Sequence, residues 1–215
     1  ARSSRPPRML TISNLDFQIE ARPLFESASA QISAGWKVGL VGRNGTGKST
    51  LLRLIREDVE NPRGDSAIRL NSGARLGWVA QEVAASDETI LDVVLAADTE
   101  RHALMQEAET ATDPDRIGAI HERLLDIDAW TAEARAAEVL NGLGFTNEDL
   151  GRATKEFSGG WRMRAAIAGV LFSQPDFLLL DEPTNYLDLE GAAWLESYIR
   201  KYPYTVLIVS HDREL

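Results

Sequence analysis

Residues 42–49 have the types and the spacing that are needed to bind a chain of phosphates. They read Gly-Arg-Asn-Gly-Thr-Gly-Lys-Ser and match the pattern G-x-x-x-x-G-K-[ST]. Glycines let the backbone pass close to an anion, so that successive N–H groups point at it from the start of a helix. In this pattern Lys48 reaches the terminal phosphates and the Ser49 hydroxyl binds Mg²⁺. The predicted contacts to the nucleotide are Gly42, Arg43, Asn44, Gly45, Thr46, Gly47, Lys48, Ser49 and Thr50.

The segments on both sides of this phosphate loop are of the kinds that must position it. Residues 37–41 are short and apolar, as in a buried strand, and residues 50–55 have the pattern of the first turns of a helix. The alternative is a glycine-rich turn between a strand and a helix that binds no ligand. The flanking strand and helix favour the phosphate site, because they supply the structural context in which the motif acts.

A pair of carboxylates follows another apolar run. Residues 177–180 predict a buried strand, and Asp181 and Glu182 come directly after it. Ligands of α/β folds bind at the carboxyl ends of parallel strands. Asp181 is therefore placed to hold Mg²⁺, directly or through water, and Glu182 to accept a proton from a water that attacks the γ-phosphate. The alternative is that both carboxylates only cap the next element, ahead of Pro183.

Three further positions are ambiguous when each is taken alone. Ser158, followed by Gly159 and Gly160, opens a predicted helix. It can be an N-cap, or it can present a hydroxyl and bare N–H groups to an anion. Gln81 follows a predicted strand, where a single glutamine is usually a solvated surface residue. His211 follows an apolar run, where a single histidine is more often structural.

The order of elements predicts an α/β fold with an inserted helical part. Strands are predicted at 9–19, 27–32, 67–70, 75–79, 177–180 and 205–209, and helices in the same regions at 50–55, 161–172 and 191–201. Apolar strands bounded by helices indicate a parallel sheet covered on both faces. Helices are predicted between them at 89–111, from Asp113 and Pro114 onward, and at about 131–140. The predicted domains are a core of residues 9–86 and 157–215, a helical subdomain of 87–156, and a leader of 1–8.

Composition limits the class of protein. The 215 residues are 44% hydrophobic, which is enough for one sizeable core. No apolar run approaches the ~20 residues of a membrane span, and no secretory signal is visible. The absence of cysteine excludes disulfides and agrees with the reducing cytoplasm, where we expect the protein. The net charge of −10 makes the chain a poor general binder of nucleic acid, so such a partner needs a local basic patch or a part of the protein outside this sequence.

Taken together, these motifs resemble the nucleotide-binding domain of ATP-binding-cassette (ABC) proteins. The six motifs stand in the family's order: residues 42–49 resemble Walker A, Gln81 the glutamine loop, Ser158–Gly160 the signature, 177–181 Walker B followed by its catalytic Glu182, 186–188 the D-loop, and His211 the switch histidine. The resemblance implies an ABC-type P-loop NTPase fold with a mixed core sheet, an antiparallel β edge and an inserted α-helical subdomain. It also implies ATP and Mg²⁺ as cofactors.

The roles of the residues follow from the same resemblance. Ser49, Asp181 and Gln81 serve the metal, Glu182 is the catalytic base, and His211 contacts the γ-phosphate, with Gln81 also near the attacking water. The signature residues Ser158, Gly159 and Gly160, together with Asp188 of the D-loop, contact nucleotide in the closed pair of cassettes, the signature reaching ATP bound to the second cassette. An isolated cassette is therefore expected to bind ATP but to hydrolyse it slowly.

Details of the motifs resemble the ABC-F branch, which consists of soluble proteins with two cassettes in one chain. Residues 161–164 continue the signature as Trp-Arg-Met-Arg, and Asn185 follows the Pro-Thr after Walker B. The chain resembles the first cassette of such a protein. The branch generally acts on ribosomes near the exit tRNA site, so ribosome and tRNA are the implied partners. The alternative function is an ATPase subunit of a membrane ABC transporter, and a third is a regulatory module without turnover, which the presence of Glu182 and His211 disfavours.

Two departures and one ambiguity accompany this resemblance. Phe157 stands where the family usually has leucine, and the aromatic residue that stacks on adenine aligns with Ile19, with Phe17 nearby. The helices around Asp113 and Pro114 form either a short arm that touches a ribosomal partner or the ordinary helical subdomain of a cassette. Their mixed and mainly acidic charge favours the ordinary subdomain.

Overall fold

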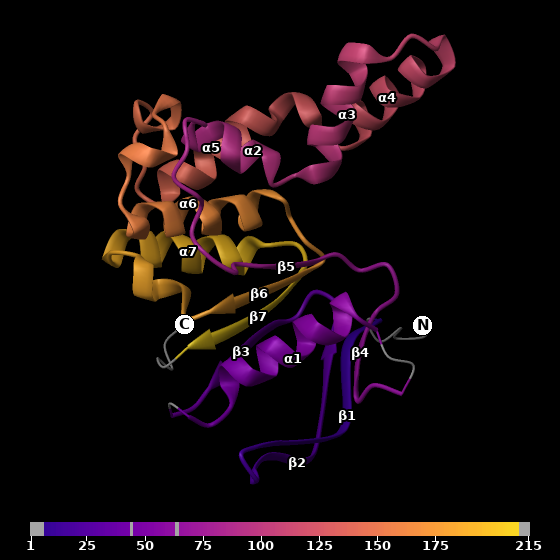
Figure 1. The fold of residues 1–215 in the computed structure, drawn as a ribbon, viewed down its shortest axis with the longest axis vertical. Helices are drawn as coiled ribbons and strands as arrows, with labels where there is room; N and C mark the ends of the chain where they lie inside the picture. The colour runs from indigo at the N-terminus through magenta and orange to yellow at the C-terminus, as the bar shows by residue number, and fades with distance from the viewer. Residues whose placement is uncertain (1–6, 44, 63–64, 211–215) are drawn as a thin grey trace, which may run out of the picture. The chain divides into compact units, whose positions relative to one another are not determined.

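The computed structural model describes residues 7–43, 45–62 and 65–210 (Figure 1). The chain forms two compact units. The first, here the β unit, comprises residues 1–78, 174–185 and 196–215. The second, the helical unit, comprises residues 79–173 and 186–195. The predicted division into a core and a helical subdomain at residues 87–156 stays a prediction.

The β unit contains two sheets within its described residues. The four-stranded sheet is parallel and has the order β3 (Lys37–Val41), β7 (Thr205–Ser210), β6 (Phe177–Asp181) and β5 (Leu76–Trp78). The three-stranded sheet is antiparallel and has the order β2 (Arg22–Ser33), β1 (Arg8–Ile19) and β4 (Ile68–Leu70). The prediction of an α/β fold with parallel strands and an antiparallel edge is confirmed, and the two kinds of pairing belong to separate sheets.

Strand β2 begins five residues before the predicted strand at 27–32, and it includes Pro23. Proline usually interrupts a strand, because it cannot donate a ladder hydrogen bond. Since β2 lies at the edge of its sheet, that missing N–H costs nothing when it faces away from β1.

A single hydrophobic core holds the first helix of the β unit in place. Helix α1 (Lys48–Glu60) buries Leu52 and Ile55. The same core contains Leu179 of β6 and Leu207 of β7, together with Leu10 of β1. Burial of such side chains stabilises by about 1.5–3 kcal/mol each. The N-terminus of α1, which follows the phosphate loop, is therefore anchored by packing over both sheets.

The helical unit contains α2 (Ile90–Ala96), α3 (Thr99–Thr110), α4 (Pro114–Asp126), α5 (Ala132–Gly142), α6 (Gly159–Phe172) and the first residues of α7 (Leu189–Lys201). The prediction of one helix over 89–111 is wrong, because this segment forms two helices. The Asp98 side chain accepts a hydrogen bond from the Arg101 N–H and so starts α3 as its N-cap. The predicted start at Asp113 and Pro114 is confirmed, with Asp113 accepting from the Asp115 N–H.

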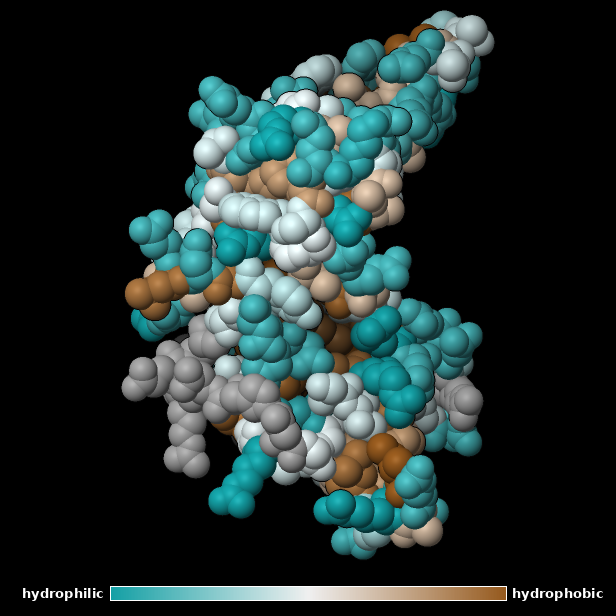
Figure 2. Space-filling model, turned by 60° about the vertical axis from the view of Figure 1, so that its left-hand side comes forward, coloured by the Kyte–Doolittle hydropathy of each residue, from teal (hydrophilic) through white to brown (hydrophobic). Residues whose placement is uncertain are grey.

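Helices α3 and α4 form a hairpin in the helical unit. Ile120 and Leu124 of α4 are buried together with Ala129, and apolar residues of α3 pack against them. Two bidentate ion pairs join the helices, from Arg116 to Glu107 and from Arg123 to Glu100. The Arg116 guanidinium lowers the pKa of the Glu107 carboxyl. The face of the molecule shown in Figure 2 is mostly hydrophilic.

We expect Gly142→Ala to destabilise the protein by about 2–3 kcal/mol, as overpacked cores do. A Cβ atom on Gly142 would lie 1.9 Å from Cε2 of Trp194, so the indole ring or α5 would have to move. The free energy of unfolding, measured by urea denaturation, checks this expectation.

Gly118→Ala is the matched control for this prediction. Gly118 lies inside α4, and a Cβ there would meet nothing within 4 Å. Alanine favours a helix over glycine by about 1 kcal/mol, so Gly118→Ala should stabilise the protein. Equal effects of the two substitutions would contradict the packing of Trp194 against Gly142.

Candidate functional site

The phosphate loop has a backbone that only glycine adopts easily at two of its positions. Gly45 and Gly47 have φ values of +79° and +94°, in the left-handed region. At Gly47 the surroundings add a second requirement, because a Cβ would lie 2.9 Å from Cδ2 of Leu24 and 3.1 Å from Cζ of Phe25. Both side chains come from β2 and lie against the loop. Asn44, one of the predicted contacts, lies outside the described residues.

Lys48 is buried, and its ammonium group folds back across the loop. Nζ donates hydrogen bonds to the backbone oxygens of Gly42 and Arg43, the second at 2.9 Å. The same residue begins α1, whose N-terminus carries the positive end of the helix dipole. A buried ammonium group and a helix N-terminus together favour an anion. The loop therefore has the donor chemistry that the phosphates of ATP require.

The two candidate carboxylates lie at the same sheet edge as the phosphate loop. Strand β7 separates β3 from β6, with Val41 beside Ser210 and Asp181 beside Val209. Because adjacent strands are about 4.8 Å apart, the end of β3 and the end of β6 are separated by roughly 10 Å. A nucleoside triphosphate with its metal ion is long enough to reach from the loop to both carboxylates. The sequence predicted that both carboxylates follow a parallel strand, at the edge where α/β folds bind ligands.

Glu182 has a strained backbone at this edge. Its φ is +47°, in the left-handed region that is uncommon for residues other than glycine. Its N–H donates to the Val209 oxygen at 2.9 Å, and its carbonyl oxygen accepts from the Asn185 N–H at 3.1 Å. These bonds hold the residue in place while its side chain is half-buried. Strained backbone that is held in this way is typical of functional sites.

A Mg²⁺ ion that binds together with a nucleotide needs only a few ligands from the protein. Within the described part of the chain, no group of three or more His, Cys, Asp or Glu side chains could hold a metal ion. Mg²⁺ in nucleotide sites is usually bound by one or two protein oxygens, water and the phosphates themselves. The Ser49 hydroxyl and the Asp181 carboxylate are both exposed and are hard oxygen donors of this kind. The residues present therefore fit a metal ion that arrives with the nucleotide.

Gln81, the signature residues and Asp188 belong to the helical unit. Gln81 is exposed in the loop that follows β5. Ser158 is the N-cap of α6, since its Oγ accepts the Trp161 N–H at 3.4 Å, and it is exposed. The capping role is thereby confirmed, and contact with an anion stays a prediction. Asp188 precedes α7, and its Oδ1 accepts the Gly191 N–H at 2.8 Å.

The signature glycines differ in their surroundings. A Cβ on Gly159 would lie 2.6 Å from Oε2 of Glu82, whereas Gly160 is exposed, with only the Ser158 hydroxyl as near as 4.0 Å. A side chain at position 159 would therefore require the Glu82 carboxylate to move. His211 follows β7 directly but lies outside the described residues.

The sequence did not single out Leu24 and Phe25. The predicted neighbours of adenine were Ile19, which is 45% exposed at the end of β1, and Phe17, which is half-buried. In the structure the side chains of Leu24 and Phe25 lie close to Gly47 of the phosphate loop. The residue that stacks on adenine stays a prediction. Recognising that β2 begins at Arg22 would have placed them opposite β1, with Phe25 paired to Phe17.

Comparison with known proteins gives consistent matches. A family model described as "ABC transporter" matches residues 25–185. The chain is 43% identical over 209 residues to "Probable ATP-binding protein YheS" of Escherichia coli (strain K12), covering 96% of this chain and 32% of that protein. It is 40% identical over 213 residues to "ATP-binding cassette sub-family F member 3" of Homo sapiens, covering 94% and 29%. The chain thus spans about a third of the length of these relatives.

Solved structures show the same fold at lower identity. The "ATP binding subunit of ABC transporter" superposes with a TM-score of 0.66 at 19% identity, covering 94% of this chain and 79% of that one. A "putative metal-chelate type ABC transporter" gives a TM-score of 0.62 at 24% identity over 95% and 73%. Among the described residues, the helices are too short or too polar to span a membrane.

Proposed function

Because the chain belongs to the ABC family, as an ATPase domain of the ABC-F branch, we propose that it is one cassette of a longer twin-cassette protein that acts on the ribosome. The phosphate loop, Asp181 and Glu182 lie at one edge of the parallel sheet. This arrangement is the main support for the proposed ATP hydrolysis. The two-cassette arrangement is supported by relatives about three times as long as this chain. The ribosome, the tRNA and the cytoplasmic location rest on the resemblance to the branch.

The proposed reaction is hydrolysis of the γ-phosphate, in which positioning and charge neutralisation do most of the work. Bound ATP would supply the phosphoryl group, and a Mg²⁺ ion held by Ser49 and Asp181 would neutralise charge on its phosphates. Lys48 would bind the terminal phosphates. Glu182 accepts a proton from the water whose oxygen attacks phosphorus as the bond to ADP breaks. Gln81 and His211 orient the water and the γ-phosphate.

The full-length protein carrying Glu182→Gln should pellet with ribosomes in the presence of ATP and remain in the supernatant without nucleotide. The physical reason is that a cassette that binds ATP without hydrolysing it accumulates in its closed state, so a partner of that state is retained. Co-sedimentation through sucrose measures the effect. The matched control adds Lys48→Ala to the same protein, which should remove the dependence on ATP.

A protein that binds ATP but never pellets would contradict the ribosomal part of the proposal. It would not affect the assignment of the chain as an ATPase domain. It would favour the alternative function, in which ATP hydrolysis by this chain drives transport through a separate membrane protein. Pelleting that is equal with and without ATP would show a ribosome contact that the nucleotide does not control. That result would contradict the proposed coupling.

A further inference from the structure

A hollow of about 520 Å³ opens in the β unit beside the C-terminal half of α1. Its floor is apolar and contains Leu15 and Phe17 of β1, Leu54 of α1 and Ile68 of β4. Leu15 and Ile68 belong to the core of the unit, whereas Phe17 and Leu54 are half-buried. The half-buried side chains leave apolar surface open to the solvent inside the hollow.

One face of α1 forms a wall of this hollow. Leu54, Glu57 and Asp58 line the hollow and follow the spacing i, i+3, i+4, which places side chains on the same face of a helix. Glu60 belongs to the same last turn, but it is two residues from Asp58 and so lies on a different face, away from the hollow. The wall is therefore apolar toward the middle of α1 and acidic toward its C-terminus.

The acidic end of α1 is unfavourable for the helix itself. A helix C-terminus carries the negative end of the helix dipole and is stabilised by cations. The last turn of α1 contains Glu57, Asp58 and Glu60 and no basic residue. Residues 57–66 together carry four carboxylates and one base, Arg63. Proteins break such local rules mainly at functional sites, so the arrangement indicates a cation that comes from outside this segment.

The arginines of α1 do not neutralise Asp58. The Arg56 guanidinium stacks on Trp78, with Cζ 4.6 Å from the ring centroid. Arg53 lies 3.8 Å from Glu57, and both side chains are more than half exposed, so this ion pair contributes little. The Asp58 carboxylate is half-buried and has no hydrogen bond or ion pair within the described part of the chain.

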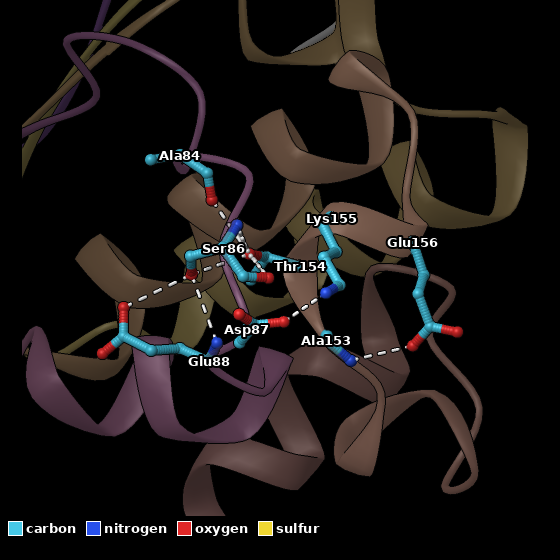
Figure 3. A network of polar contacts seen from close by, with 8 residues as sticks. All are labelled: Ala84, Ser86, Asp87, Glu88, Ala153, Thr154, Lys155 and Glu156. Carbon is cyan, nitrogen blue, oxygen red and sulfur yellow. Dashed lines mark hydrogen bonds and ion pairs between the residues drawn. The ribbon is translucent and has the colours of Figure 1, made fainter.

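Carboxylates of the helical unit show the more usual arrangement (Figure 3). Beside Thr154, Asp87 pairs with Lys155, and Glu156 accepts a hydrogen bond from a backbone N–H. Each of these exposed carboxylates thus has a donor within its own unit. Asp58 is less exposed and lacks such a donor, which makes it a better candidate for a donor from a partner.

We propose that this hollow docks a basic and partly apolar segment of a partner protein. An apolar side chain of the segment rests on Leu54 and Ile68, and a lysine or arginine pairs with Asp58. The long stems of basic side chains also cover apolar surface, so they suit both the floor and the rim of the hollow. The four carboxylates of residues 57–66 attract and orient such a partner, whereas they repel the phosphates of a nucleic acid. Docking at this hollow does not depend on the proposed ATP hydrolysis or on the ribosome.

A short synthetic peptide in which leucine and lysine alternate is the probe that tests the docking site. The full-length protein is isotope-labelled on the methyl groups of leucine and isoleucine, and the peptide is added in steps at low salt while NMR spectra are recorded. We expect saturable shifts of the methyl resonances of Leu54 and Ile68. A peptide in which glutamate replaces lysine should not shift them, because like charges repel.

Asp58→Asn and Glu60→Gln form a matched pair of variants. Each removes one carboxylate from the last turn of α1, but only Asp58 lines the hollow. Asp58→Asn should raise the dissociation constant of the lysine peptide roughly fivefold, because a charge-assisted hydrogen bond is lost. Glu60→Gln should change it less than about twofold, as expected for an exposed charge outside the contact. Asp58→Glu, which keeps the charge, should bind the peptide like the parent.

The melting temperature separates a docking role of Asp58 from a structural one. Both substitutions of the matched pair remove a charge that opposes the helix dipole, so neither should lower the melting temperature. Weaker peptide binding by Asp58→Asn without loss of stability supports the docking site. If Asp58→Asn does lower the melting temperature, Glu57→Gln decides by the same titration.

The absence of saturable shifts at Leu54 and Ile68 overturns the proposal. Equal weakening by Asp58→Asn and Glu60→Gln also overturns it, since it would show only a general attraction between opposite charges. Shifts of the same methyl groups by a short single-stranded RNA, and not by the lysine peptide, would reveal a different class of partner and would overturn it as well. ATP affinity should equal that of the parent in all these variants, so a failed docking test leaves the proposed function untouched.

Discussion

Lys48→Ala is expected to weaken ATP binding roughly a hundredfold, the equivalent of about 3 kcal/mol. The buried ammonium group of Lys48 bonds to two carbonyl oxygens of its own loop, so it is held where the phosphates must lie. Its charge-assisted bonds to phosphate are lost with the side chain. Titration with a fluorescent ATP analogue, at fixed ionic strength and with excess Mg²⁺, measures the dissociation constant.

Lys37→Ala is the matched control for Lys48→Ala. Lys37 also donates to two backbone oxygens, those of Gly35 and Tyr204, but it lies at the start of β3, away from the phosphate loop. We expect its dissociation constant for ATP to equal that of the parent. Parent-like ATP affinity of Lys48→Ala would contradict the assignment of the loop.

The sequence predicted most elements of the fold where local signals were strong. Asp113 followed by Pro114 is such a signal, and α4 begins there. The missed break between α2 and α3 has no glycine or proline, so the apolar pattern continued through it. Asp98 ahead of Thr99 and Glu100 was the available signal, since aspartate is a preferred N-cap. The early start of β2 was missed because proline is tolerated in a strand only at the edge of a sheet. The position of β2 in its sheet depends on strand pairing, which the local sequence does not show.

The candidate site was predictable to the extent that its residues are neighbours in the chain or at parallel strand ends. The phosphate loop is one continuous motif, and Asp181 and Glu182 end a strand beside β7. The contact of Phe25 with Gly47 depends on how β2 packs, which no local pattern contains. The partners of the buried Thr154 hydroxyl, the Ala84 oxygen and the Ser86 N–H, are about seventy residues away, so this network was not visible in the sequence (Figure 3). Such contacts between distant segments require the three-dimensional structure.

Glu182→Gln is expected to lower the turnover of this cassette by at least about a hundredfold, within the range that general bases contribute. Glutamine keeps the size and the backbone of glutamate but cannot accept the proton that the attacking water must lose. ATP should bind as tightly as in the parent or more tightly, because one negative charge near the γ-phosphate is removed. Phosphate release in single turnovers measures the chemical step, and nucleotide titration measures binding.

The control Glu190→Gln removes a carboxylate of the same kind outside the site. Glu190 is exposed in the first turn of α7, so its loss should change neither turnover nor affinity. The strained φ of +47° at position 182 costs glutamine as much as glutamate, so the melting temperature of Glu182→Gln should also match the parent. Unchanged stability and binding with lost turnover would leave proton transfer as the step that fails. Parent-like turnover would instead mean that another group accepts the proton, and that the strained backbone at Glu182 has a different purpose.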